Sequence, residues 1–165
     1  AGSTATLMGT IDAARKLQLF YTGTPWACLF RGKELFDQTR LRSDAESGVY
    51  HFVKTPLEVY QSPSMVDIRA KQVFATMEQD TWGLQKGDIV LVTTNGLYKR
   101  LSSNEIQEHI DHCLEKGRGM RFLATDLVKS AIEKNDSKKP DDGEPDSANK
   151  NDVPEDIVVL VMRVV

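Results

Sequence analysis

Cysteine is scarce in this sequence of 165 residues. Its two cysteines, Cys28 and Cys113, lie far apart and in no Cys-x-x-Cys spacing. This spacing argues against a disulfide framework and against a cysteine-based zinc site. We therefore expect both thiols to be buried as small apolar side chains in a reducing compartment.

The sequence also lacks long apolar runs and a strong excess of charge of one sign. No run approaches the roughly 20 apolar residues of a membrane-spanning helix, and the first residues lack the basic and apolar regions of a signal peptide. The 21 basic and 24 acidic residues leave a net charge of −3, which argues against a nucleic-acid or anionic-membrane surface. We expect a soluble intracellular protein with neither a nucleic-acid partner nor membrane insertion.

The residues that are present suit one domain over residues 1–165. A hydrophobic content of 40% is enough for a real core in a chain of this length. Residues 135–152, in contrast, contain almost no apolar side chain. They cannot offset the roughly 1 to 2 kcal/mol per residue that ordering costs, so we predict a disordered loop there.

The strand patterns are clearest at the two ends of the chain. Apolar residues alternate cleanly over 17–21 and 26–30, and loosely over 4–11, which predicts an antiparallel meander. Residues 40–80 contain several prolines and predict loops, with a loosely patterned strand over 71–77. The last residues, 157–165, form a continuous β-branched run typical of a central strand.

Two amphipathic helices are predicted after residue 101. Ser102 and Glu105 have the spacing of a capping box, and apolar residues then recur at helical spacing until Gly117 ends the first helix. The second helix is predicted over residues 120–134. Two helices after a strand meander indicate an α+β fold.

The stretch 87–102, GDIVLVTTNGLYKRLS, organises the rest of the chain. Residues 89–92 are an unbroken apolar run, the pattern of a strand that is buried on both faces. The dipeptide Asn95-Gly96 follows and readily adopts positive φ. We therefore predict a sharp turn that presents Asn95 at the carboxyl end of this strand.

These residues resemble the metal-site motif of the type 2C, metal-dependent Ser/Thr protein phosphatases. That family has a strand introduced by Gly-Asp and ending in Thr-Asp-Gly-Leu-aromatic-Asp. Gly87-Asp88, Thr94 and Gly96–Tyr98 fit this motif, whereas Asn95 replaces the metal-binding Asp and Lys99-Arg100 replaces the later acid. Other segments resemble the family in the same order: Gly2–Ala5, Gly23–Gly32, Thr55–Asp67 and Glu155–Val161.

The resemblance implies a type 2C phosphatase-like α/β/β/α sandwich, of which this chain is the C-terminal part, with a mainly antiparallel sheet and two helices. The family's upstream Asp-Gly-His-Gly loop, which supplies the first metal ligands, is not in this sequence. Phe52 and the segment 55–67 are similar to one branch, the small phosphatases like the T-cell activation phosphatase of mitochondria. The expected location is therefore cytoplasmic or mitochondrial.

The resemblance also implies a site for Mg²⁺ or Mn²⁺. Glu155 falls at a ligand position, Asp156 is its neighbour, and Asn95 offers a neutral carbonyl oxygen. Thr24 stands where the family has another acid. One or two carboxylates balance two divalent ions poorly, so we expect one weakly held ion or none, and assign no catalytic residue. A turn role for Asn95, and a solvated strand entry for the two acids, stay open as alternatives.

A second possible metal site is less favoured. His109 and His112, with Glu105 and Glu108, lie one turn apart on the first predicted helix. The spacing is not that of a His-Glu-x-x-His zinc site, and polar residues at such offsets usually form the solvated face of an amphipathic helix.

Two functions follow from the resemblance. The first is a protein Ser/Thr phosphatase-like domain that is degenerate or inactive alone, in a family that hydrolyses phosphomonoesters with Mg²⁺ or Mn²⁺. The second is a pseudophosphatase that binds a phosphoprotein or a regulated protein partner. Loss of the acids at Thr24, Asn95 and Lys99 favours the second function for this chain.

Overall fold

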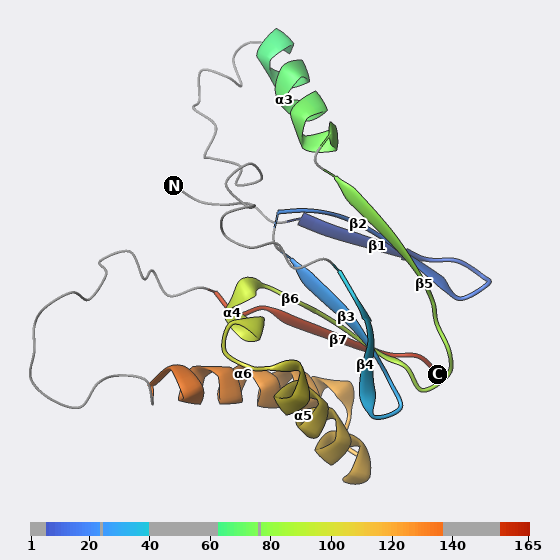
Figure 1. Ribbon diagram of the computed structural model, residues 1–165, viewed down its shortest axis with the longest axis vertical. Coiled ribbons are helices and arrows are strands. Elements are labelled where there is room, and N and C mark those ends of the chain that lie inside the picture. The colour runs from blue at the N-terminus through green and yellow to red at the C-terminus, as the bar shows by residue number, and fades with distance from the viewer. Residues whose placement is uncertain (1–5, 24, 40–62, 76, 137–155) are drawn as a thin grey trace, which may run out of the picture. The chain divides into compact units, whose positions relative to one another are not determined.

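The computed structural model describes residues 6–23, 25–39, 63–75, 77–136 and 156–165. They belong to two compact units, Ala1–Pro25 with Thr39–Gln85, and Trp26–Gln38 with Lys86–Val165. Each unit contains one antiparallel sheet (Figure 1). The predicted α+β class with mainly antiparallel strands is confirmed. None of the helices in these ranges is long and apolar enough to cross a bilayer.

The first unit's sheet combines a hairpin with a strand from much later in the chain. Its strands are β1 (Thr6–Ile11), β2 (Lys16–Thr22) and β5 (Glu78–Gly83), in the order β1-β2-β5. Asp12 holds the hairpin turn, because its Oδ1 accepts a hydrogen bond from the main-chain N–H of Lys16 at 2.9 Å. The alternation predicted for β2 is confirmed, since Leu17, Leu19 and Tyr21 are all buried.

Residues 63–75 form a helix, α3 (Pro63–Ala75), where the sequence predicted loops and a loose strand over 71–77. That strand prediction is wrong. Pro63 occupies the first helical position, where its fixed φ suits a helix and its missing N–H breaks no intrahelical bond. Good helix formers follow it over residues 69–72 and outweigh the weak alternation. The strand begins at Glu78 instead.

The second unit's sheet contains the organising stretch at its centre. Its strands are β3 (Trp26–Arg31), β4 (Glu34–Gln38), β6 (Ile89–Thr93) and β7 (Val159–Arg163), in the order β4-β3-β6-β7. β6 pairs with β3 on one side and with β7 on the other. The strand predicted from the apolar run is confirmed, and Ile89, Val90 and Leu91 are buried. β7 lies at the edge of the described sheet, although its sequence predicted a central strand.

Three helices follow β6 and build the core of the second unit. They are α4 (Asn95–Tyr98), α5 (Ser103–Glu115) and α6 (Met120–Asp136). The two long helices predicted from periodicity are confirmed, and α5 and α6 lie together beside this sheet (Figure 1). α6 continues to Asp136, and the rest of the loop predicted over 135–152 lies outside the described residues. The core cluster comprises Trp26, Cys28, Phe30, Ile89, Leu91, Leu97, Leu101, Ile106, Ile110, Cys113, Leu123, Leu127 and Ala131.

Both thiols are buried and free, as the sequence predicted. Burial raises the pKa of the Cys28 thiol well above its ordinary value. The pKa of the Cys113 thiol is also raised, mainly by burial. Both side chains therefore act as neutral packing groups in the core.

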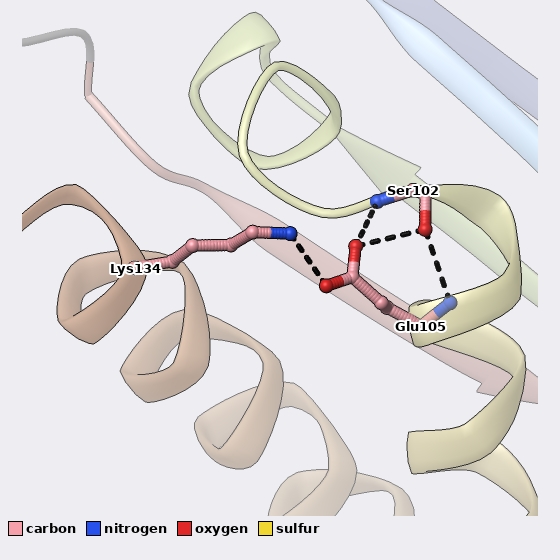
Figure 2. A network of polar contacts seen from close by, with 3 residues as sticks. All are labelled: Ser102, Glu105 and Lys134. Carbon is pink, nitrogen blue, oxygen red and sulfur yellow. Dashed lines mark hydrogen bonds and ion pairs between the residues drawn. The ribbon is translucent and has the colours of Figure 1, made fainter. Parts of the chain in front are cut away.

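The capping box at the start of α5 is confirmed and extends to α6 (Figure 2). Oε2 of Glu105 accepts hydrogen bonds from the main-chain N–H and the hydroxyl of Ser102, each at 2.8 Å. The other carboxylate oxygen pairs with the ammonium of Lys134 on α6. The Lys134 contact, followed by the bonds from Ser102, lowers the pKa of Glu105 to about 2. One carboxylate thus caps α5 and joins it to α6.

An ion pair links the end of β3 to the start of β6. Nε and Nη2 of Arg31 donate to the two carboxylate oxygens of Asp88 at 3.0 and 2.8 Å, and the Asp88 side chain is only 2% exposed. The hydrogen bond to Asp88 raises the pKa of Arg31, so the guanidinium stays charged. The carboxylate of Asp88, a residue of the Gly-Asp motif, is therefore held by Arg31.

Candidate functional site

The ends of β6 and β7 that carry the predicted site residues lie side by side. The two strands are antiparallel, with Thr93 opposite Val159. The carboxyl end of β6 therefore meets the amino end of β7. Beyond the ladder, the main-chain N–H of Thr94 donates to the carbonyl of Val158 at 3.2 Å. The two strand ends therefore converge, as a site shared by Asn95 and Asp156 requires.

Thr94 is the residue that joins the two ends. Its hydroxyl donates to the main-chain carbonyl of Asp156 at 2.6 Å and accepts from the main-chain N–H of Val158 at 3.1 Å. The hydroxyl of Thr93 adds a bond to the carbonyl of Val158 at 2.8 Å. The sequence identified Thr94 only as part of a motif. Its partners lie more than 60 positions away, so local patterns gave no signal for this role.

Asn95 is the first residue of α4 and not a left-handed turn residue. Thr94 is the N-cap with extended φ and ψ of −82° and 168°, and the described non-glycine residue with positive φ is Arg15. The predicted positive φ at Asn95 is therefore wrong. A short helix begins here because the extended Thr94 lets the chain turn directly into helical geometry.

The side chain of Asn95 is held by an aromatic residue one helical turn later. The hydroxyl of Tyr98 donates to Asn95 Oδ1 at 2.9 Å. The Tyr98 ring meets the ring of Trp26 edge-on, with centroids 5.7 Å apart and planes at 63°. Trp26 is itself fixed, because its indole N–H donates to Gln38 Oε1 at 3.0 Å. The amide of Asn95 is thus oriented by a chain of contacts that begins on β4.

Of the remaining predicted site residues, one lies within the described ranges and two lie outside them. Asp156 is exposed and its backbone is held by Thr94. Glu155 and Thr24 lie outside the described residues, so the metal site at Asn95, Glu155 and Asp156 stays a prediction. Arg100, which follows Lys99 at the position of the family's later acid, donates through Nη1 to the carbonyl of Gly96.

The described residues by themselves do not fit a two-ion centre. Among them, no three His, Cys, Asp or Glu side chains come together in a way that could hold a metal ion. The carbonyl oxygen of Asn95, the neutral ligand predicted here, already accepts a hydrogen bond from Tyr98. Hard divalent cations need several oxygen ligands, with carboxylates among them.

The histidines of α5 line a polar pocket of about 350 Å³ between α5 and α6. Nδ1 of His109 lies 2.7 Å from Oδ2 of Asp126 on α6. Glu105 was a possible partner of these histidines in the second metal site, but its carboxylate accepts a hydrogen bond from Ser102 and forms an ion pair with Lys134. The pocket is lined by Glu108, His109, His112, Arg118 and Asp126.

Sequence comparison gives no relative, since neither a family model nor a curated protein matches this chain. Solved structures match its fold. The Mycobacterium tuberculosis serine/threonine phosphatase PstP/Ppp is 17% identical at a TM-score of 0.60, over 98% of this chain and 60% of that chain. PppA, a key regulatory component of the T6SS in Pseudomonas aeruginosa, is 12% identical at 0.61, over 99% of this chain and 58% of that chain.

The photosystem II phosphatase PBCP is also similar, at 12% identity and a TM-score of 0.56, over 81% of this chain and 47% of that chain. At such identities the likeness concerns the fold alone. The chain has the α+β fold of type 2C phosphatases, and it spans between 47% and 60% of the length of these structures. The fold class predicted from the sequence is thereby confirmed.

Proposed function

We propose that this chain is the C-terminal part of a type 2C, metal-dependent protein Ser/Thr phosphatase domain and is inactive by itself. The observation that carries this proposal is the junction of β6 and β7, where Thr94 holds the backbone of Asp156 beside Asn95. The likeness in fold to PstP/Ppp and PBCP supports it. So does the order of the motifs along the chain.

The cofactor proposed for the complete domain is Mg²⁺ or Mn²⁺. Such ions bind phosphate oxygens and lower the pKa of a bound water. In this chain Glu155 and Asp156 are the carboxylates assigned to that role, with Asn95 as a neutral neighbour. Two divalent ions bring four positive charges, which one or two carboxylates do not balance. Turnover by these residues alone is therefore not expected.

The test is hydrolysis of a chromogenic phosphomonoester by the purified chain with millimolar Mn²⁺. We expect no turnover above buffer, while an intact type 2C phosphatase in the same assay serves as the positive control. Glu155→Ala is the matched variant. Metal-dependent turnover that Glu155→Ala abolishes would overturn the inactive assignment.

A pseudophosphatase is the second candidate, with a phosphoprotein or a regulated protein as its partner. It is favoured by the bond from Tyr98 to Asn95 Oδ1, and by Thr24, Asn95 and Lys99 at positions where the family has acids. An Asp-Gly-His-Gly loop encoded upstream in the same gene would favour the first candidate. Its absence there would favour the second. The mitochondrial branch and a mitochondrial location belong to the proposal too, and rest on the resemblance of residues 52–67. A cytoplasmic location is the alternative.

A further inference from the structure

The pocket between α5 and α6 is lined by ionisable side chains that are only partly paired with one another. Of its five lining residues, His109 and Asp126 bind each other, with 2.7 Å between Nδ1 and Oδ2. The side chains of Glu108, His112 and Arg118 make no hydrogen bond or ion pair with any other residue that the structure describes. The pocket therefore presents one carboxylate and one guanidinium that are both unpaired.

Arg118 is held in place through its backbone and through its side chain. Its main-chain N–H donates to the carbonyl of Cys113 at 2.9 Å, in the turn that Gly117 makes with a φ of 63° after α5. The thiol of Cys113 donates back to the Arg118 carbonyl at 3.5 Å. The guanidinium packs on the ring of Phe122, with Cζ 4.1 Å from the ring centroid. An arginine that is already ordered loses less conformational entropy when it binds a ligand.

Glu108 lines the same pocket from α5 but forms no ion pair with Arg118. Opposite charges attract, so two such groups around one pocket would be expected to meet if the fold let them. Here the fold keeps them on the lining without a direct contact. A bound molecule that carries both a positive and a negative group would join the two side chains across the pocket.

Other classes of ligand fit this lining less well. An inorganic anion would be attracted by Arg118 but would also approach the carboxylates of Glu108 and Asp126. A metal ion would be repelled by Arg118, and no three His, Cys, Asp or Glu side chains within the described ranges are arranged to hold one. An apolar molecule would take these charges out of water without giving them partners. A zwitterion avoids all three costs.

We propose that this pocket binds a small zwitterion, a free amino acid, whose carboxylate is bound by Arg118 and whose ammonium group is bound by Glu108. A guanidinium offers a carboxylate two parallel N–H donors, and a carboxylate accepts from an ammonium group. The volume of about 350 Å³ lies at the small end of the roughly 300 to 1,000 Å³ that ligand pockets span. None of the five lining residues belongs to the candidate metal site, so the proposal does not rest on phosphatase activity.

The test is an NMR titration of the ¹⁵N-labelled 165-residue chain. The probes are glycine, β-alanine and 4-aminobutyrate, in which the two charges lie progressively farther apart. Each probe is compared with the carboxylate and the amine that carry only one of its two charges. We expect at least one zwitterion to bind at least about tenfold more tightly than either of its controls, because each control leaves one side chain of the pocket unpaired. If no zwitterion binds more tightly than its controls, the proposal is overturned.

Two variants test the assigned roles. Arg118→Gln and Glu108→Gln are each expected to weaken binding of the tightest zwitterion at least about tenfold. Lys129→Gln and Glu115→Gln remove the same charges at exposed positions outside the lining, and should leave the affinity unchanged. Zwitterion binding that persists in both pocket variants would show that these two side chains do not recognise the ligand.

The same titration locates the bound molecule. Amide shifts are expected over residues 108–112 and 118–126, which carry the lining. Shifts centred on another part of the chain would assign the zwitterion to a different site and overturn the proposal. All four substituted side chains are exposed, so the variants should fold. The comparison of zwitterions with their controls needs no variant and decides the proposal on the parent chain alone.

Discussion

The hydroxyl of Thr94 lies 2.6 Å from the main-chain carbonyl oxygen of Asp156, 62 positions later in the chain. The same hydroxyl accepts the main-chain N–H of Val158 at 3.1 Å. One side chain thus satisfies two backbone groups at the point where β7 begins. The position of Asp156 relative to Asn95 therefore depends on Thr94 as well as on the strand ladder.

Thr94→Val is expected to lower the free energy of unfolding by roughly 1 to 3 kcal/mol, because the isosteric side chain removes two hydrogen bonds. Thr94→Ser keeps the hydroxyl and is the matched control. Urea unfolding of the three proteins measures the difference. A Thr94→Val variant as stable as the parent chain would show that the hydroxyl makes no net contribution at this junction.

Asn95→Asp restores the acid that the type 2C motif has at this position. We expect it to tighten Mn²⁺ binding by about tenfold, since affinity of oxygen-ligand sites rises with the number of charged ligands. Asn95→Ala removes the carbonyl oxygen and should not tighten binding. Isothermal titration with MnCl₂ measures all three proteins. Equal affinity of Asn95→Asp and Asn95→Ala would remove this position from the proposed metal site.

Removing one partner of the Arg31–Asp88 pair is expected to lower the free energy of unfolding strongly, whereas removing both partners should lower it only a little. Arg31→Met leaves the 2%-exposed carboxylate without its two guanidinium bonds, and is expected to lower the free energy of unfolding by about 3 kcal/mol. Arg31→Met with Asp88→Leu removes both charges and should recover much of this loss.

Denaturant unfolding of both single variants and the double variant completes the thermodynamic cycle for this pair. If the single losses simply add in the double variant, then the two side chains are not coupled. The interaction between the two side chains would then make no measurable contribution to stability.

The part of this fold that could be predicted from the sequence is the part set by local patterns. The alternation in β2, the apolar run of β6 and the Ser102–Glu105 capping box all depend on residues close together in the chain. The prolines of residues 40–80 favour loops over sheet because proline fixes φ and lacks an N–H donor, but the same two properties suit Pro63 to the first position of a helix. Asn95 was assigned to a turn by its propensity, whereas Thr94 and the helix after it determined its φ.

The long-range contacts of the second unit, at the candidate site and elsewhere, could not be predicted in this way. The Arg31–Asp88 pair joins residues 57 positions apart, and the Thr94–Asp156 bond joins residues 62 apart. Nothing in the local sequence of either partner specifies the other. The bond from Tyr98 to Asn95 spans one helical turn, and could have been anticipated had α4 been predicted.

The last prediction concerns pH, through the carboxylate that caps α5. Contact with Lys134, together with the bonds from Ser102, lowers the pKa of Glu105 from 4.5 to about 2. A carboxyl group with a lowered folded-state pKa contributes its stability fully above the unfolded-state value. That contribution is lost as the pH falls from about 4.5 through 2. Lys134→Gln removes the largest cause of the shift, so the Glu105 pKa should move toward its ordinary value and the loss in acid should become smaller.

Glu105→Gln keeps a side chain that suits the capping box but removes the charge, so its stability should not show this loss in acid. Ser102→Ala is expected to lower the free energy of unfolding by about 1 kcal/mol at neutral pH. Urea unfolding between pH 7 and pH 2, with carbon-13 NMR titration of the Glu105 carboxyl, measures both quantities. A Glu105 carboxyl that titrates near its ordinary value in the parent chain would mean that the Lys134 contact does not persist in solution. Helices α5 and α6 would then be held together by their apolar contacts and by the contact between His109 and Asp126.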